Sequence, residues 1–313
     1  MLNRRILRIK AFKVIYGYAV TGRKSPEDAC TELEQSCQST RDLYLLMLAL
    51  IAPLTGEARS RIEAARSKFN PTEEERHPNE KFADNALAPL LENDAEFRKI
   101  LSRKGLGWER YDIFIRDLYD AVRVRPYFLA YMESGESSLA EDCRLFIKIF
   151  EEELVDNEAL EPILEELSLY WNDDLAYALT WCCRTLEDLA AGRRWHLPEL
   201  YQSDIVRRRR PGADMDSDRD FVRKLVRCAL AGYERYFNKV TESVPDWDSD
   251  RLFSSDMAII ACAMAELENF PEIPQNVTLN EYIEISKFYC SPKSRGFING
   301  LLDRFVKENS KTE

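Results

Sequence analysis

The stretch SPKSRGFINGLLDRFV, residues 291–306, has the pattern of a helix with a basic start and a buried apolar face. Ser291 followed by Pro292 is typical of an N-cap and a first helical residue. Apolar residues then recur at i, i+1, i+4, i+5 and i+8, which predicts a buried helix face. These residues are Phe297, Ile298, Leu301, Leu302 and Phe305. Burial of this face does not explain the polar and basic residues at its start, Lys293, Ser294 and Arg295.

The rest of the chain repeats this helical periodicity. Apolar residues almost never alternate with a period of two, and they recur at intervals of three and four instead. We therefore predict an all-α fold. The expected helices span residues 2–21, 41–53, 83–103, 108–135, 138–154, 157–170, 173–191, 219–240 and 255–268, with two more starting near Thr278 and at Pro292.

Patterns within three of these helices predict what each one buries. The expected buried residues are Ile9, Phe12, Tyr16 and Ala19 in the first helix, Met257, Ile260, Ala261 and Met264 in 255–268, and Leu279, Tyr282 and Ile283 in the next. Thr278 with Glu281 three residues later has the pattern of a capping box at a helix start. The polar, proline-bounded stretch 70–85 is expected to be a loop, and RRRRPGADMDSD at 207–218 a turn-rich linker with a basic block.

Composition excludes several classes of protein. The chain has 313 residues, long enough for two domains or one elaborated helical domain. Its eight cysteines form no CxxC pair and it has two histidines, so we expect no zinc site and no disulfide framework. The longest apolar run, Leu43 to Ala52, is too short to span a bilayer, and no apolar core follows the N-terminal charges as in a signal peptide. We expect a cytoplasmic protein without a membrane partner.

Charge restricts any nucleic-acid role to a local surface. The net charge is −11, so the molecule as a whole repels nucleic acid. Residues 1–24 are the exception, because they hold seven basic residues and no acid. Within them Arg4, Arg5 and Arg8 fall in an arc of roughly 100° on an ideal helix. Guanidinium groups in one arc are a good surface for phosphates, and we expect these three to lie exposed.

No pattern indicates catalysis. The chain has no glycine-rich phosphate loop, and its two histidines suggest no Ser, His and Asp set. Adjacent carboxylates such as Asp173 and Asp174 are abundant, but in so acidic a chain they are typical of solvated helix faces or caps. We therefore expect a protein that is not an enzyme and has no cofactor, no metal and no catalytic residue.

Four stretches, in order along the chain, together form one family pattern. They are NRRILRIKAFKVIYGY at 3–18, DMAIIACAMAEL at 256–267, IPQNVTLNEYIEISKFY at 273–289 and SRGFINGLLD at 294–303. Together they resemble the NusB family of transcription antitermination factors. LNEYIEISK followed by FINGLLD is the most specific part, and FVRKLVRCALAGYERYFNKV at 221–240 resembles the family's third helix.

The resemblance covers residues 1 to about 52 and about 219 to 308. It implies two small helical bundles packed together, with the intervening residues inserted between the family's second and third helices. We expect N-terminal NusB-like helices in 1–55, an inserted acidic helical segment in 56–215 and a C-terminal NusB-like helical bundle in 216–313.

The resemblance also implies a function and a site. Members bind boxA-type single-stranded RNA jointly with NusE, a ribosomal small-subunit protein, in the RNA polymerase antitermination complex, notably on ribosomal RNA operons. Carried over by position, the RNA-binding residues are Arg4, Arg5, Arg8, Lys293, Ser294, Arg295 and Phe297. Tyr16 and Glu266 match positions on the NusE-facing side.

Two other readings remain open at this point. One is a helical adaptor that has lost RNA binding and contacts proteins through its acidic insertion. The other is an RNA-binding module related to rRNA methyltransferases, although the chain lacks the glycine-rich turn that a catalytic unit of that kind needs. The block Arg207 to Arg210 would extend the RNA track if it lies beside the N-terminal arginines.

Overall fold

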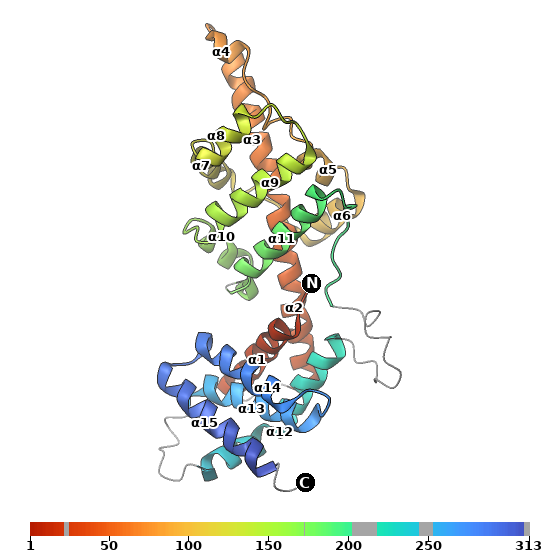
Figure 1. Ribbon diagram of the computed structural model, residues 1–313, viewed down its shortest axis with the longest axis vertical. Coiled ribbons are helices and arrows are strands. Elements are labelled where there is room, and N and C mark those ends of the chain that lie inside the picture. The colour runs from red at the N-terminus through yellow and green to blue at the C-terminus, as the bar shows by residue number, and fades with distance from the viewer. Residues whose placement is uncertain (22–24, 172, 202–217, 244–252, 310–313) are drawn as a thin grey trace. The chain divides into compact units, whose positions relative to one another are not determined.

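The computed structural model describes residues 1–21, 25–171, 173–201, 218–243 and 253–309. Their regular elements are all helices, and these residues contain no sheet (Figure 1). An isolated parallel bridge joins Leu2 to Tyr201. The predicted all-α fold is confirmed. The chain divides into two compact units, which we call the terminal unit (Met1–Cys37 with Glu199–Glu313) and the inserted unit (Gln38–Pro198). The sequence led us to expect the inserted part at 56–215.

The terminal unit is built around one central helix. Its helices are α1 (Arg4–Thr21), the first part of α2 (Pro26–Ala49), α12 (Asp218–Ser243), α13 (Ser254–Asn269), α14 (Gln275–Tyr289) and α15 (Pro292–Asn309). Helices α1, α12, α14 and α15 pack around α13 (Figure 1). Every residue of α13 from Asp256 to Glu266 is therefore buried, including the four predicted from its pattern.

The buried face predicted for α1 is largely wrong. Of its four residues only Phe12 is buried, and Tyr16 is exposed. Because α1 packs against both α12 and α13, it buries a broader and different set. That set is Leu7, Arg8, Lys10, Ala11, Phe12, Val14 and Ile15. The set includes the charged residues Arg8 and Lys10, whose burial cannot be predicted from the spacing of apolar residues.

The capping box predicted at Thr278 is also wrong. Helix α14 begins three residues earlier, at Gln275, so Thr278 lies inside its first turns. The Thr278 hydroxyl is buried and donates to Glu266 Oε1 at 2.8 Å, while Glu281 pairs with Arg5. Both side chains that matched the motif have partners in other helices. Of the side chains expected to be buried in α14, Tyr282 is buried and Leu279 and Ile283 are only partly so.

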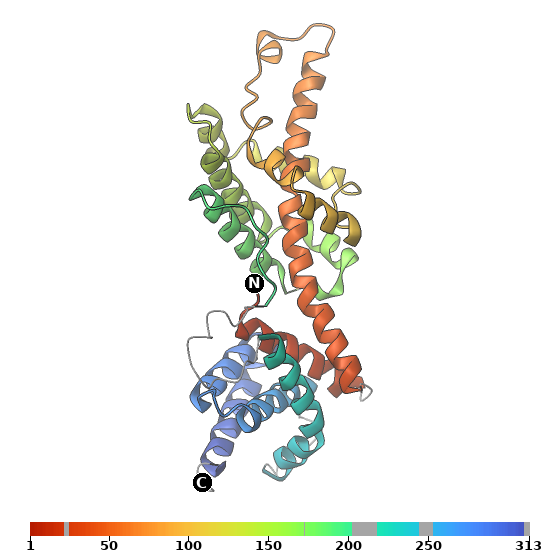
Figure 2. The same ribbon diagram turned by 90° about the vertical axis from the view of Figure 1, so that its right-hand side faces the viewer.

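The inserted unit is a second helical assembly. After the remainder of α2 it contains α3 (Ile51–Arg66), α4 (Glu73–Arg76), α5 (Leu87–Glu92), α6 (Ala95–Lys104), α7 (Asp112–Val122), α8 (Pro126–Glu133), α9 (Leu139–Ile149), a π-helix η1 (Phe150–Leu154), α10 (Leu160–Leu167), a 3₁₀ turn η2 (Leu169–Trp171) and α11 (Leu175–Ala190). Helix α3 follows α2 after Leu50 (Figure 2). Pro53 stands in the first turn of α3, where its missing N–H costs no helical hydrogen bond.

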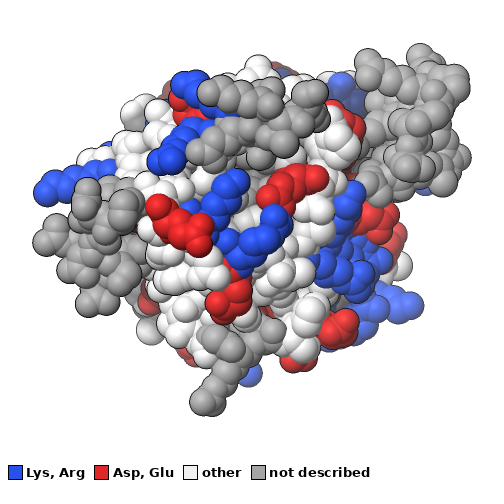
Figure 3. Space-filling view, turned by 90° about the horizontal axis from the view of Figure 1, so that it is seen from below, with Lys and Arg blue, Asp and Glu red and all other residues white. Residues whose placement is uncertain are grey.

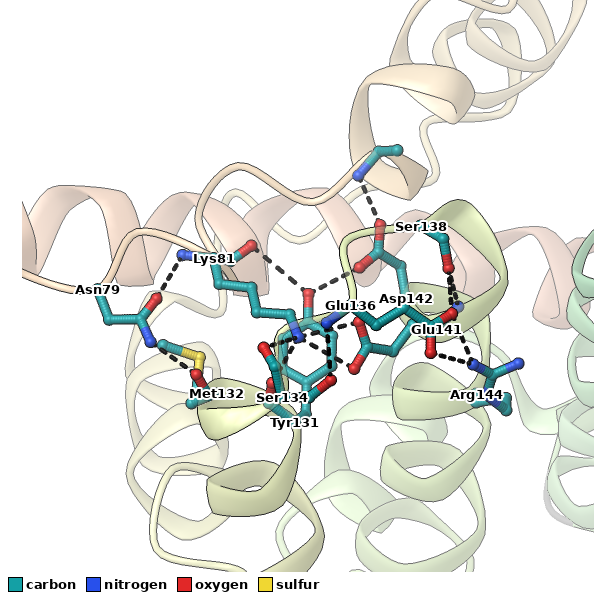
Figure 4. A network of polar contacts seen from close by, with 11 residues as sticks. Asn79, Lys81, Tyr131, Met132, Ser134, Glu136, Ser138, Glu141, Asp142 and Arg144 are labelled. Atoms are coloured by element: carbon teal, nitrogen blue, oxygen red, sulfur yellow. Dashed lines mark hydrogen bonds and ion pairs between the residues drawn. The ribbon is translucent and has the colours of Figure 1, made fainter.

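The polar stretch 70–85, expected to be a loop, contains a short helix and is hydrogen-bonded to neighbouring helices. It contains the short helix α4, whose capping box joins Thr72 and Glu75. Further along, Lys81 Nζ donates to Tyr131 O at 2.6 Å and to Glu141 Oε1 at 3.0 Å (Figure 4). The Tyr131 hydroxyl in turn donates to Asp142 Oδ1 at 2.7 Å. This network fixes the segment before α5 to α8 and α9.

The negative charge is concentrated in the inserted unit. Residues 38–198 contain 20 Lys and Arg against 31 Asp and Glu, whereas the terminal unit has 24 of each. One helical stretch, Pro26–Arg66, is long and apolar enough to span a membrane by length and composition. Because 61% of its most apolar window is buried within the protein, the stretch has the character of a core helix.

Candidate nucleic-acid interface

Helix α1 starts with an asparagine cap and a basic first turn. The Asn3 side-chain oxygen accepts from Ile6 N at 3.0 Å, which satisfies one of the free amides of the helix start. No acid lies in this turn, although helix dipoles favour one there. The positive N-terminus of α1 is therefore reinforced by Arg4 and Arg5.

Arg5 is the most exposed arginine of the three, with 52% of its side chain accessible. It forms a bidentate pair with Glu281 of α14, Nε to Oε2 at 2.8 Å and Nη2 to Oε1 at 2.7 Å. The hydrogen bonds from Arg5 hold the pKa of Glu281 below its ordinary value, against the opposing effect of partial burial. The guanidinium therefore has one edge on a carboxylate and the other side toward solvent.

Arg8 is buried, so the expectation that it lies in an exposed turn is wrong. Only 4% of its side chain is accessible, and it pairs with the fully buried Glu266 of α13, Nη2 to Oε1 at 2.6 Å and Nε to Oε2 at 2.8 Å. Burial alone would lower the pKa of Arg8, but hydrogen bonding and charge from Glu266 outweigh it and raise the pKa. Glu266 also accepts from Thr278 and Tyr282, so the pair joins α1, α13 and α14.

Arg4 is partly buried where α1 meets α12. Its Nε lies 3.1 Å from Asp218 Oδ1, and its guanidinium lies over the Phe221 ring at 4.5 Å. Both partners belong to α12. The three arginines thus form a cluster, but they pair with carboxylates of three different helices.

The start of α15 has the predicted cap. Ser291 Oγ accepts from Ser294 N at 3.1 Å, and the two hydroxyls lie 2.9 Å apart, which confirms Ser291 as the N-cap before Pro292. Ser294 is buried, and its hydroxyl lies against that of Ser291. Lys293 is exposed and Arg295 partly so.

The apolar face of α15 is packed as its pattern predicts. Ile298, Leu301, Leu302 and Phe305 are all buried. Phe297, at the edge of this face, is half-buried. Its ring therefore has both core and surface character, and a base-stacking role stays a prediction.

Packing between α1 and α14 connects the two basic helix starts. Arg5 lies against Glu281, and Phe12 lies against Tyr289 with ring centroids 4.9 Å apart. Eight residues of α14 separate these contacts, about 12 Å along a helix axis. Lys13 Nζ lies 5.9 Å from the Tyr289 ring, just before α15 begins. Sequence reasoning placed Lys13 in the basic segment without assigning it to the site.

The two partner-facing residues differ in accessibility. Tyr16 is 43% exposed and lies beside Phe12, with ring centroids 6.2 Å apart, so it is available to a partner. Glu266 has no accessible surface, and its expected place on a partner-facing surface is wrong. Its carboxylate is instead needed by Arg8.

Basic and acidic side chains are interspersed on one face of the protein, where Figure 3 shows Lys and Arg beside Asp and Glu. Among the described residues, no group of three or more His, Cys, Asp and Glu side chains could hold a metal ion. The block Arg207 to Arg210 lies outside the described residues. The candidate site is therefore a surface defined by Arg5, Lys293 and Arg295.

Taken together, the fold and site define a helical protein whose first helix begins with three arginines, each paired with a carboxylate of a different C-terminal helix. The NusB family model matches residues 196–307, which include α12 to α14 and nearly all of α15. The chain is 36% identical over 119 residues to the transcription antitermination protein NusB of Geobacter sulfurreducens, covering 38% of this chain and 82% of that protein. The chain belongs to the NusB family.

Further relatives have the same description. The chain is 29% identical over 133 residues to the transcription antitermination protein NusB of Thermoanaerobacter sp., covering 39% of this chain and 91% of that protein. It is 32% identical over 94 residues to that of Listeria monocytogenes, covering 30% of this chain and 73% of that protein. No solved structure matches. Membership of this family confirms the expectation of a non-enzymatic protein.

Proposed function

We propose that this chain is a transcription antitermination factor that acts in the cytoplasm. It binds boxA-type single-stranded RNA together with NusE, the ribosomal small-subunit protein, within the RNA polymerase antitermination complex on ribosomal RNA operons. Family membership supports the antitermination role, because the relatives are named for it. The identity of the RNA, of the partner and of the operons goes beyond what the relatives' names state, and is proposed from the family resemblance.

The half-exposed guanidinium of Arg5 supports the RNA-binding part most directly. It lies at the positive end of α1, and a helix start with free amides attracts phosphate. Lys293 and Arg295 repeat this arrangement at the start of α15, and α14 connects the two places. A phosphate backbone running along α14 would meet a cation at each end.

Buried and paired residues narrow the predicted RNA surface. Arg8 has its guanidinium on Glu266 and supports the surface from inside, while Arg4 is partly covered by Phe221. We propose that the half-exposed ring of Phe297 stacks on an RNA base, since bases of single-stranded RNA are commonly recognised by aromatic stacking. Tyr16 is offered as a contact to NusE.

RNA binding by the full chain, with and without a NusE-type protein at two salt concentrations, tests the proposal. Arg5→Glu should weaken binding and reduce the salt dependence, because log affinity falls by about 0.7 per single-strand phosphate contact and log unit of salt. Arg59→Glu, which changes the same charge in the inserted unit where Arg59 is half exposed, is the control. Equal affinity of wild type and Arg5→Glu would contradict RNA binding at this surface.

The adaptor is the second candidate, and one observation favours it. Each N-terminal arginine already has a carboxylate partner inside the terminal unit, so none needs a phosphate to balance its charge. An adaptor predicts partner binding with no measurable affinity for boxA-type RNA at low salt. The same titration separates the two candidates.

A further inference from the structure

The inserted unit contains a pocket of about 490 Å³ between α10 and the start of α11. The turn after η1 forms one wall, α10 a second and the first residues of α11 a third. All its lining residues belong to the inserted unit, and none lies in the surface proposed for RNA.

The inner surface of the pocket is apolar and well supported. Leu164 and Trp171 are buried among the lining residues. The Trp171 indole N–H donates to Ser39 O at 2.8 Å, which fixes the orientation of the ring. Val155, on the wall, is 42% exposed. An aliphatic chain entering the pocket would remove the exposed part of Val155 from water and pack against the buried Leu164 and Trp171.

Carboxylates that lack cationic partners surround this apolar surface. Asp156, Glu158, Glu161 and Glu165 line the pocket, and none forms an ion pair with a Lys or Arg of the described residues. The acids just before them differ, because Glu153 pairs with Arg125 at 2.7 Å. These four carboxylates line the pocket without a counter-charge among the described residues.

The surrounding sequence leaves this charge uncompensated. Residues 149–183 contain ten Asp and Glu and no Lys or Arg. Like charges gathered at one place repel each other, and a cationic ligand relieves that repulsion. The complementary ligand has a positive end and an apolar stem, which is the chemistry of Lys and Arg side chains.

We propose that this pocket docks a basic segment of a partner protein. Lys and Arg side chains of that segment lay their aliphatic stems on Leu164, Trp171 and Val155. Their charged ends meet Asp156, Glu158, Glu161 and Glu165. Nucleic acid is the wrong charge for this pocket, so the inserted unit adds a protein contact to a chain whose RNA surface lies elsewhere.

The experiment uses the full chain and a fluorescent twelve-residue peptide, four repeats of Lys-Leu-Arg, with Gln-Leu-Gln repeats as the uncharged control. In one variant Asp156→Asn, Glu158→Gln, Glu161→Gln and Glu165→Gln remove the charges. A matched control removes four exposed acids of the same unit that do not line the pocket: Glu63→Gln, Glu74→Gln, Asp117→Asn and Glu133→Gln. Ala176→Trp, at an exposed lining position, fills the pocket and keeps every charge.

We expect the basic peptide to bind wild type and the matched control alike, and to bind both pocket variants at least about tenfold more weakly, some 1.4 kcal/mol. Affinity for RNA should be unchanged in all three variants, so this proposal and the RNA proposal fail separately. Equal weakening in the matched control would show diffuse attraction and overturn the proposal. So would an unaffected Ala176→Trp, or binding that appears only after Arg207 to Arg210 are replaced by serine, since the occupant would then be the chain's own segment.

Discussion

Arg5 and Arg8 lie one helical turn apart in α1, yet their surroundings give them different roles. Arg8 is paired with a fully buried carboxylate, and removing one partner of such a pair leaves the other charge buried alone. Arg5 pairs with Glu281 at the surface, where ion pairs contribute little to stability. The same residue type is structural at one position and available for binding at the other.

Stability measurements should separate these two roles. Arg8→Ala is expected to lower the free energy of unfolding of the terminal unit by about 3–5 kcal/mol, because Glu266 loses its counter-charge. Arg5→Ala should cost at most about 1 kcal/mol. Urea unfolding followed by circular dichroism measures both. Similar losses for the two variants would mean that burial does not distinguish them.

In the proposed RNA surface, Glu281 would compete with RNA phosphates for Arg5, so removing its charge is expected to strengthen RNA binding rather than weaken it. Replacing Glu281 by Gln removes a negative charge from the surface and weakens its hold on Arg5. RNA affinity should therefore rise, by up to about fivefold for an exposed pair worth at most about 1 kcal/mol. Filter binding or fluorescence anisotropy at low salt measures the change.

Glu284→Gln is the matched control for that prediction. Glu284 lies on the same helix and pairs with Lys287 rather than with Arg5. Glu284→Gln removes the same charge near Arg5 but leaves the bidentate Arg5–Glu281 pair intact, so it separates the effect of charge from the loss of that pair. A fall in RNA affinity for Glu281→Gln would show instead that the carboxylate positions Arg5 for binding.

At the scale of elements, α15 combines a packed face with a basic start. Ile298, Leu302 and Phe305 anchor the helix in the core, and Ser291 caps it. Lys293 and Arg295 take no part in either task. Replacing their charges is therefore expected to leave the stability of the fold unchanged.

Reversing both charges should therefore affect binding alone. Lys293→Glu with Arg295→Glu is expected to weaken RNA binding about tenfold or more and to lower the salt slope by about 1.4, two single-strand contacts. The melting temperature should remain close to that of wild type. Lys307→Glu, an exposed change at the far end of the same helix, is the control. Unaltered affinity in the double variant would remove the α15 start from the site.

At the scale of the whole molecule, the two units divide the charge. The terminal unit is neutral overall, and the inserted unit holds the entire net charge of −11. An acidic unit is a poor surface for RNA and a suitable one for proteins. On charge alone, the inserted unit is therefore the better candidate for a protein contact and the terminal unit for RNA.

Deleting the inserted unit tests this division. Replacing Gln38–Pro198 with a short linker is feasible because Tyr201 OH donates to Glu34 Oε2 at 3.2 Å, so the flanking segments already lie together. Affinity for boxA-type RNA should stay within about tenfold of wild type, some 1.4 kcal/mol. Circular dichroism first verifies that the deletion folds. Lost RNA affinity in a folded deletion would contradict the division.

The sequence by itself determined the helical class, the family and the start of α15. Each of these depends on local information: a period of three to four residues, a Ser-Pro cap, or a contiguous motif such as LNEYIEISK. Such signals act within a few residues of one another. The same local patterns also predicted the positions of Arg5, Lys293 and Arg295 at helix starts, and these side chains are at least partly accessible in the structure.

Only the tertiary structure decided which charged residues are internal. Arg8 and Glu266 lie 258 positions apart, and nothing near either one signals that they meet. Thr278 and Glu281 match a capping box by spacing, but α13 and α1 supply stronger partners. A buried ion pair is stable only when its partner, its hydrogen bonds and its desolvation are all in place, and those are properties of packed helices rather than of any one segment.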